Sequence, residues 1–322
     1  MPKTVNSLMA YIRNEKGIHV SGSAQKKKLR YMGYFHGYKG YRYCREPHIL
    51  FNFSDFDELQ SIYEFDMKIK TIFYPQIMFI ETVIKNYALE CILDENNSER
   101  FADVFSKALT SYKSFDVGTS NYKEHMAKRL KLREHVFSAI SREYRRPIVS
   151  HYYDLDKPVP IWAIFELLTL GEFGSFVSCM SNPLKIRLSK EIGIKTSFDP
   201  DGRIPEMYIF TIKDLRNAIA HNGTVFDTRF KTGKINSRLS TYIKSETGIS
   251  NITFDTIVDY LLLIVFILKG LQCNRSIIHN FVSDFERSCE NLRKQIPIGI
   301  YNQILYTDTR NKLTKIKDYI KF

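Results

Sequence analysis

The chain has 322 residues, of which 44% are hydrophobic and 25% charged, a globular composition that excludes a disordered or collagen-like protein. With 47 Lys and Arg against 35 Asp and Glu, the formal net charge is +12, which is expected to attract a polyanion such as nucleic acid or an acidic membrane surface. The longest apolar run, Leu261 to Leu268, is too short to cross a bilayer, and the first residues contain no apolar signal segment. We therefore expect a soluble, cytoplasmic protein without membrane spans.

Residues 1–58 are the least periodic part of the chain and are predicted to form a small N-terminal helical lobe. A basic run precedes an aromatic and glycine-rich stretch, Tyr31 to Tyr43. Within it, Tyr34 and Tyr38 beside Lys39 would suit the stacking of RNA bases. The alternative is that these rings pack the lobe against the rest of the protein.

From Phe56 to Leu93, apolar residues recur at helical spacing. This pattern predicts one long helix, or two helices that meet at Pro75, because an interior proline removes a backbone donor. Glu81 lies close to the apolar stripe. A carboxylate turned toward a core needs a partner, so Glu81 is either paired there or located at the rim.

The next helical segment, residues 121–146, is strongly basic and is the best candidate for a phosphate-binding face, with a solvated helix face as the alternative. The residues predicted to bind RNA here are Lys128, Arg129, Lys131, Arg133, Arg142, Arg145 and Arg146.

The remaining segments are also predicted to be mainly helical. Residues 158–171 read as one buried helix that prolines open and Gly171 closes, and residues 205–222 as another that ends before Gly223. A basic loop or hairpin insertion is expected near 224–250, followed by helices over 253–295 and about 308–321. The predicted fold is therefore all-α, with residues 59–322 as one helical domain.

The segment that carries chemistry runs from Asp214 to Gly223. Asn217 and His221 are an i,i+4 pair on one helix face, while Ile212, Leu215 and Ile219 form the buried face. Together with Arg216, this set suits the cleavage of RNA without a metal. The ribose 2′-OH attacks its own phosphate, a histidine moves a proton near neutral pH, and a guanidinium binds the phosphate oxygens.

An ideal helix places Arg216 and His221 about 140° apart, so they do not point at one spot. Either the helix end unwinds or two copies of the chain meet. A symmetric dimer in which both motifs line one cleft would solve this geometry.

The string Arg216-Asn-Ala-Ile-Ala-His221-Asn222 resembles the Arg-Asn-x-x-Ala-His-Asn signature of HEPN domains. Three further stretches resemble the Abi-like (AbiD/AbiF) family of abortive-infection proteins: 29–43, 62–85 and 160–171. The resemblance runs from about residue 10 to residue 225. It departs after the motif, where residues 223–229 open a basic insertion in place of an aromatic-rich turn.

The resemblance implies a HEPN-type helical bundle that acts as a metal-independent endoribonuclease toxin in phage defence, as a homodimer. Arg216 and His221 would be the catalytic pair, Asn217 an orienting residue, and Glu81 the acidic partner that holds Arg216. A structured small non-coding RNA would be the partner that restrains the toxin, as the positive charge would suit.

Other functions stay open at the level of sequence. The chain could be a non-catalytic RNA-binding protein of a defence ribonucleoprotein, or a scaffold that pairs with another protein. It has five scattered cysteines without a C-x-x-C pair, no H-x-x-x-H pair and no Walker-type loop, so we predict neither a metal site nor a cofactor.

Overall fold

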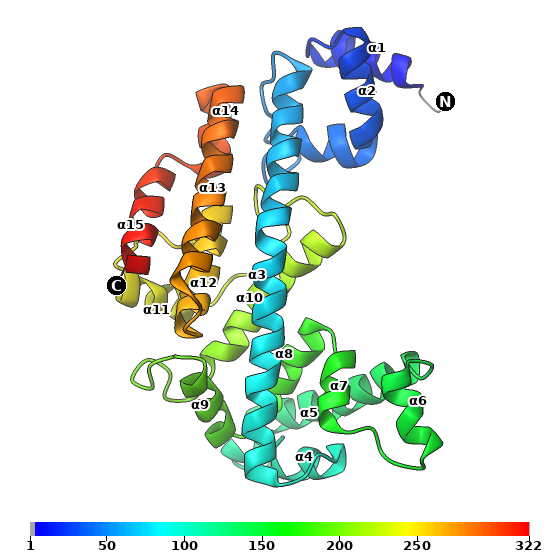
Figure 1. Cartoon of the computed structure of the whole chain (residues 1–322), viewed down its shortest axis with the longest axis vertical. Helices are drawn as coiled ribbons and strands as arrows, with labels where there is room; N and C mark the ends of the chain where they lie inside the picture. Colours follow the sequence, from blue (N-terminus) through cyan, green and yellow to red (C-terminus); the bar gives the residue numbers. More distant parts are fainter. Residues whose placement is uncertain (1–3, 322) are drawn as a thin grey trace. The chain divides into compact units, whose positions relative to one another are not determined.

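The structure is a computed structural model that describes residues 4–321, which form helices joined by loops (Figure 1). Over this range there are three isolated β-bridges and no β-strand. The predicted all-α fold class is confirmed. The backbone packs into two compact units: the first contains the chain up to Ile77, Asp214–Lys269 and the part from Cys273 onward, and the second contains Met78–Lys213 and Gly270–Gln272.

The first unit is built around one fully buried helix, α12 (Ile257–Gly270), whose side chains are buried on every face from Ile257 to Leu268. Within this unit, α15 (Thr309–Lys321) packs against α13 (Arg275–Gln295) and α11 (Ser237–Thr247) (Figure 1). The other elements that lie wholly in this unit are α1 (Val5–Lys16), α2 (Gly22–Met32), the π-helical turn η1 (Gly33–Lys39), α11 (Ser237–Thr247), α13 (Arg275–Gln295), α14 (Ile298–Leu305) and α15 (Thr309–Lys321).

The second unit is arranged around α5 (Ser120–Arg142), which packs against α7 (Ile161–Leu167), α8 (Leu170–Cys179) and the 3-10 turn η2 (Ser111–Ser114). The ring of Phe165 on α7 meets Phe173 and Phe176 of α8 at 5.2 and 4.9 Å between centroids. The remaining elements of this unit are α4 (Phe101–Lys107), η2 (Ser111–Ser114), α6 (Pro147–Asp154), α7 (Ile161–Leu167), α8 (Leu170–Cys179) and α9 (Asn182–Glu191).

Apart from α12, of which only Gly270 falls in the second unit, two helices are divided between the units. One is α10 (Ile204–Ala220) and the other is α3 (Phe56–Asn96), a single helix of 41 residues that is about 62 Å long at 1.5 Å per residue. Pro75 lies inside α3 with its ring exposed, so the prediction of one long helix is confirmed. Between residues 4 and 321, no helix combines the length and the apolar character needed to span a membrane.

Residues 158–171 do not form one helix as predicted. They contain α7 and the start of α8, which are separated by Thr169. The Thr169 hydroxyl accepts from the backbone N–H of Glu172 at 3.3 Å, and the Glu172 carboxylate accepts from the N–H of Thr169 at 2.8 Å. This capping box begins a new helix. Gly171 therefore lies in the first turn of α8 and closes no helix.

The expected loop or hairpin near 224–250 is helical in its second half, where Asn236 caps the start of α11. The first half is an irregular segment tied to its neighbours: Thr232 donates to Asp214, and Lys231 pairs with Asp255 at 2.6 Å. Segments 253–295 and 308–321 are helical as predicted, as α12, α13 and α15.

The predicted boundary between a 1–58 lobe and a 59–322 domain stays a prediction. In the first unit, the segment that precedes α3 packs on a residue from far along the chain. The ring of Phe226 lies 5.7 Å from Tyr41, which it stacks on, and 6.2 Å from Phe51.

Candidate functional site

The side chain of Asp199 caps the start of the motif helix α10. The buried carboxylate of Asp199 accepts from the backbone N–H groups of Arg203 at 2.9 Å and Ile204 at 3.2 Å, which satisfies donors that a helix start leaves without partners. Ile212 and Leu215 are buried as predicted, together with Tyr208, whereas Ile219, which was expected on the same face, is only half-buried.

The end of α10 is a Schellman motif. The N–H of Gly223 donates to the carbonyl of Ala218 at 2.6 Å, and the N–H of Asn222 donates to the carbonyl of Ile219 at 3.1 Å. Asn222 has φ 52°, so Asn222, and not Gly223 as expected, takes the left-handed conformation that ends the helix. Asparagine is among the few residues besides glycine that adopt this conformation readily.

The structure places the three motif residues at this helix end. Asn217 and His221 are exposed, Arg216 is half-buried, and the Arg216 guanidinium lies 3.4 Å from the side-chain oxygen of Asn217, to which it donates. The backbone N–H of His221 still donates to the carbonyl of Asn217 at 3.0 Å. Because the helix is intact up to His221, unwinding does not bring Arg216 and His221 together in this chain.

Glu81 lies on the part of α3 that belongs to the second unit and is 7% exposed, so it is not at the rim. Its carboxylate accepts from the Lys85 ammonium at 3.1 Å, and Lys85 also donates to the carbonyl of Leu168. Arg216 belongs to the first unit, so the expected pairing of Glu81 with Arg216 stays a prediction.

A buried ion pair on α3 holds the segment that follows the motif, and the sequence analysis missed it. Asp66 pairs with Lys70 at 2.8 Å and accepts from the backbone N–H groups of Val225 at 2.8 Å and Phe226 at 2.7 Å. Lys70 in turn donates to the side chain of Asn222 at 3.0 Å. The pair thus connects α3 to the end of the motif helix.

Asp66 has one more partner, the Tyr41 hydroxyl, which donates to it at 2.6 Å. Burial raises the pKa of this phenol, so Tyr41 stays protonated and acts as a donor. A sequence signal for the site existed: Asp66 and Lys70 are an i,i+4 pair at positions where the helical stripe calls for apolar residues.

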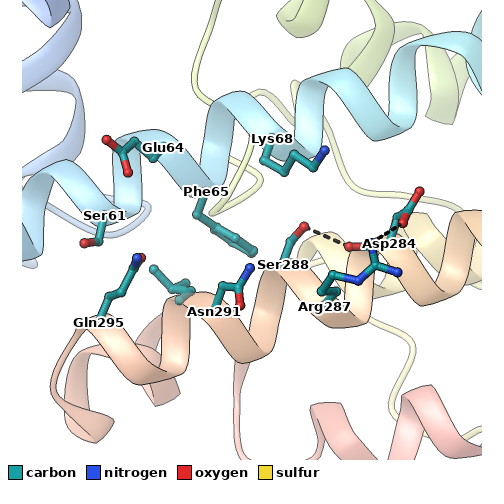
Figure 2. Close-up of a pocket in the computed structure, with 10 residues that line it drawn as sticks. Ser61, Glu64, Phe65, Lys68, Asp284, Arg287, Ser288, Asn291 and Gln295 are labelled. Carbon is teal, nitrogen blue, oxygen red and sulfur yellow. Dashed lines mark hydrogen bonds and ion pairs between the residues drawn. The ribbon is translucent and has the colours of Figure 1, made fainter.

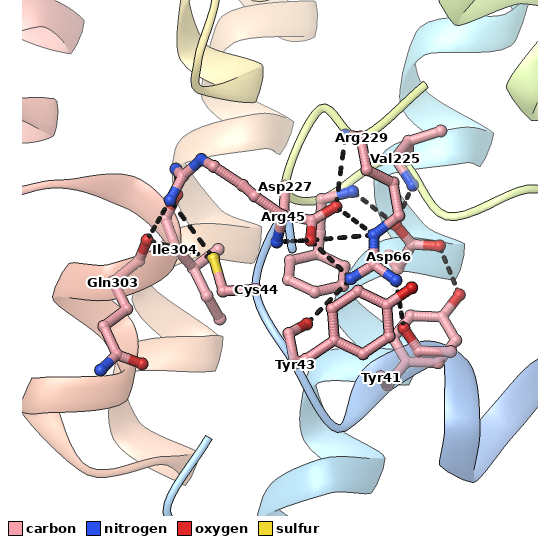
Figure 3. A network of polar contacts seen from close by, with 12 residues as sticks. Tyr41, Tyr43, Cys44, Arg45, Asp66, Val225, Asp227, Arg229, Gln303 and Ile304 are labelled. Carbon is pink, nitrogen blue, oxygen red and sulfur yellow. Dashed lines mark hydrogen bonds and ion pairs between the residues drawn. The ribbon is translucent and has the colours of Figure 1, made fainter. Parts of the chain in front are cut away.

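A second polar network holds the start of the insertion (Figure 3). The fully buried Asp227 pairs with Arg229 at 2.5 Å and accepts from the backbone N–H of Arg45 at 2.6 Å. Arg229 also donates to the carbonyls of Gly40 and Tyr43, both at 2.8 Å. Arg229, a basic residue of this insertion, therefore forms contacts within the chain.

In the aromatic stretch of the N-terminal part, Tyr38 packs inside the protein and does not face solvent. This side chain is 1% exposed, its ring stacks on Tyr34 at 5.6 Å, and burial raises its pKa. A base cannot stack on a buried ring, so we withdraw Tyr38 as an RNA-binding residue. Lys39 is exposed, and its ammonium lies 5.4 Å from the centre of the Tyr34 ring.

The basic residues of α5 do not form one face. Arg129 is half-buried and donates to the carbonyls of Phe105 and Leu109, both at 2.7 Å, so its guanidinium anchors the segment after α4. Lys128 and Lys131 line a hollow on one side of the helix, whereas Arg133 lines a pocket on another. A helix rotates 100° per residue, which separates the two sets.

The three arginines at the end of α5 are exposed. Arg142 pairs with Glu143 at 3.2 Å, and Arg146 lies 3.8 Å from the same carboxylate. Arg142, Arg145 and Arg146 line a shallow hollow in the loop that leads to α6.

The first unit has a pocket of 220 Å³ between α3 and α13 that contains none of the predicted site residues (Figure 2). Glu64 and Lys68 line it from α3, and Asp284 and Arg287 from α13, where they pair at 3.2 Å. Both acidic and basic side chains line the pocket, so its charge favours neither an anionic nor a cationic ligand. From residue 4 to residue 321, no group of three His, Cys, Asp or Glu side chains is placed to hold a metal ion.

Of the comparisons with known proteins, one assigns the chain to a family. No curated protein and no solved structure shows a significant match to the chain. The family description of Abi-like proteins, however, matches residues 27–227, which include α3, α10 and the motif. This match covers more than half of the 322 residues, and the chain therefore belongs to the Abi-like protein family.

Proposed function

We propose that this protein acts in phage defence by abortive infection, and that it does so as a metal-independent endoribonuclease of the HEPN type. Membership of the Abi-like family supports the defence role. The ribonuclease proposal rests on one observation: a histidine, an asparagine and an arginine are gathered at the exposed, capped end of α10, where a buried ion pair holds the following segment.

The chemistry follows from the side chains. His221 takes the proton from the ribose 2′-OH, or returns one to the leaving 5′-oxygen, and the 2′-oxygen attacks the neighbouring phosphorus. Arg216 binds the phosphate oxygens and opposes the charge that develops on them. The products are a 2′,3′-cyclic phosphate and a 5′-hydroxyl. Asn217 orients Arg216, because the Asn217 side-chain oxygen accepts a hydrogen bond from the guanidinium.

The complete site belongs to a homodimer in this proposal. Because α10 runs to Ala220 and the His221 N–H still donates to the carbonyl of Asn217, Arg216 and His221 of one chain project about 140° apart. Two copies related by a twofold axis can bring Arg216 of one chain beside His221 of the other. Glu81 would hold the arginine through an ion pair, and a small structured RNA would restrain the toxin by occupying basic surfaces of the +12 chain.

The first test is RNA cleavage in EDTA by the purified wild type, His221→Ala and His279→Ala. His279 is an exposed histidine of α13 in the same unit and serves as the matched control. We expect the wild type and His279→Ala to shorten total RNA and leave cyclic phosphate ends, while His221→Ala does not. Cleavage by His221→Ala at the wild-type rate would refute the assignment.

The dimer is tested separately by mixing two inactive chains. A heterodimer of Arg216→Ala and His221→Ala retains one arginine and one histidine from different copies, so co-expression should restore part of the activity. If both variants are inactive alone and stay inactive together, the site is not shared between two chains.

A non-catalytic RNA-binding protein is the second candidate, favoured by the net charge of +12. It predicts that neither the wild type nor His221→Ala shortens RNA and that both proteins retain one discrete RNA on purification. Its binding would weaken steeply with salt.

A further inference from the structure

The second unit contains an apolar pocket of 430 Å³ that the proposed cleavage site does not use. Its walls include Phe105 of α4, Phe137 of α5 and Tyr153 of α6. Phe137 and Tyr153 are 51% and 45% exposed, which is unusual for large apolar side chains that face a hollow. The volume lies in the range of sites that take small organic groups.

Two arginines line the pocket together with these rings. Arg133 lies 5.7 Å from the centre of the Phe105 ring and 6.0 Å from that of Phe137, and Arg100 also lines the pocket. In the part of the chain that the structure describes, neither Arg100 nor Arg133 forms an ion pair with a carboxylate. The pocket thus combines apolar faces with positive charge that has no acidic partner.

The aromatic wall continues toward the basic loop after α5. Tyr153, which lines the pocket, meets Tyr144 at 5.8 Å between ring centroids. Tyr144 in turn lines the shallow hollow with Arg145 and Arg146. The two hollows are therefore neighbours, joined by a pair of tyrosine rings that are 52% and 45% exposed.

We propose that the aromatic pocket takes an unpaired base of an RNA strand, with the adjacent phosphates bound by Arg100 and Arg133 and the strand continuing toward Arg145 and Arg146. Bases of any sequence stack on aromatic side chains, and guanidinium groups bind phosphates in the same sites. Double-stranded RNA keeps its bases stacked inside the helix and cannot offer one. This inference rests on the proposed function in one respect, which is that RNA is the ligand.

An apolar protein helix fits the pocket less well. It would cover Arg100 and Arg133 without supplying a partner, and an uncompensated buried charge is strongly unfavourable. A nucleotide supplies both the flat apolar group for the rings and the anion for the guanidinium groups. Charge complementarity therefore selects an RNA strand as the occupant.

The test measures binding of a short single-stranded RNA that carries 2-aminopurine, in the full-length His221→Ala background so that the RNA stays intact. We expect Phe137→Leu to weaken binding by about tenfold and to remove the quenching of 2-aminopurine, whereas Phe137→Trp keeps both because it keeps a stacking surface. Arg133→Gln should lower the slope of log K against log salt by about one.

Two matched variants control for folding and for charge. Leu130→Ala changes a side chain of α5 that is 53% exposed and lies outside the pocket, and Lys315→Gln removes an exposed charge from α15 in the other unit. Both should bind as the parent does. Fully paired RNA should show no difference between Phe137→Leu and Phe137→Trp.

The proposal is overturned if Phe137→Leu and Arg133→Gln bind single-stranded RNA like their parent, or if AMP alone displaces the RNA from the pocket at micromolar concentration. The second result would assign the pocket to a free nucleotide. Failure here is separate from failure of the ribonuclease proposal: wild-type protein that cleaves RNA while Phe137→Leu binds normally overturns only the pocket. Pocket-dependent binding without cleavage overturns only the nuclease.

Discussion

Asp66→Asn should be among the most destabilising single substitutions in the first unit. The carboxylate is fully buried, pairs with Lys70 and accepts from Tyr41, Val225 and Phe226. The amide keeps the size of the side chain but removes its charge, which leaves the Lys70 ammonium buried without its counterion. Breaking a buried pair in this way costs about 3–5 kcal/mol of the free energy of unfolding.

Urea unfolding followed by far-UV circular dichroism measures this cost. With a urea dependence of about 2–3 kcal/mol/M, the midpoint should fall by about 1–2 M. Hydrogen exchange gives a local readout, because the amides of Val225 and Phe226 donate to Asp66 and should lose protection. Adding Lys70→Met removes the orphaned charge, so the double variant should recover part of the loss. A midpoint shift below about 0.3 M for Asp66→Asn, with those amides still protected, would refute the reasoning.

Three further predictions concern single positions. Asn222→Ala should lower the free energy of unfolding by about 1–2 kcal/mol more than Asn222→Gly does, because both variants lose the hydrogen bond from Lys70 but only alanine is strained at φ 52°; equal losses in chemical denaturation would contradict the role of backbone conformation. Pro75→Ala should stabilise the protein by about 1–2 kcal/mol because it restores a backbone donor inside α3, and a lower melting temperature would count against this. Burial, with Lys128 and Lys185 nearby, holds the pKa of His125 below its usual 6.5. The unfolded state therefore binds more protons, stability falls as the pH drops from about 7 toward 5, and His125→Gln should flatten this decline in urea midpoints; an unchanged slope would oppose it.

Helical periodicity was sufficient to predict α3, α10 and α15, because each buries one continuous apolar stripe. Pro75 did not break α3 because its ring faces solvent and packing on both sides of it maintains the helix. The division at Thr169 was missed although its sequence signal, a threonine three residues before a glutamate, is local and readable.

The candidate site was harder to predict because its supports come from distant parts of the chain. Lys70 and Asn222 are 152 residues apart, and no local pattern could join them. The basic cluster of α5 failed as a single face for a different reason. The number of basic residues in a segment does not show which way each side chain points. On α5, Arg129 and Lys131 point to different neighbours.

The first unit is discontinuous in sequence, and this affects when the protein can become active during synthesis. A ribosome completes all but three residues of the second unit before it reaches Asp214, so most of that unit can fold early. The first unit needs its N-terminal part, the motif segment and the helices that follow Cys273, so it can close only after those helices have been synthesised. The proposed Arg216 and His221 site lies in this late unit. Under the proposed function, the nascent chain would therefore lack ribonuclease activity until those helices have been synthesised.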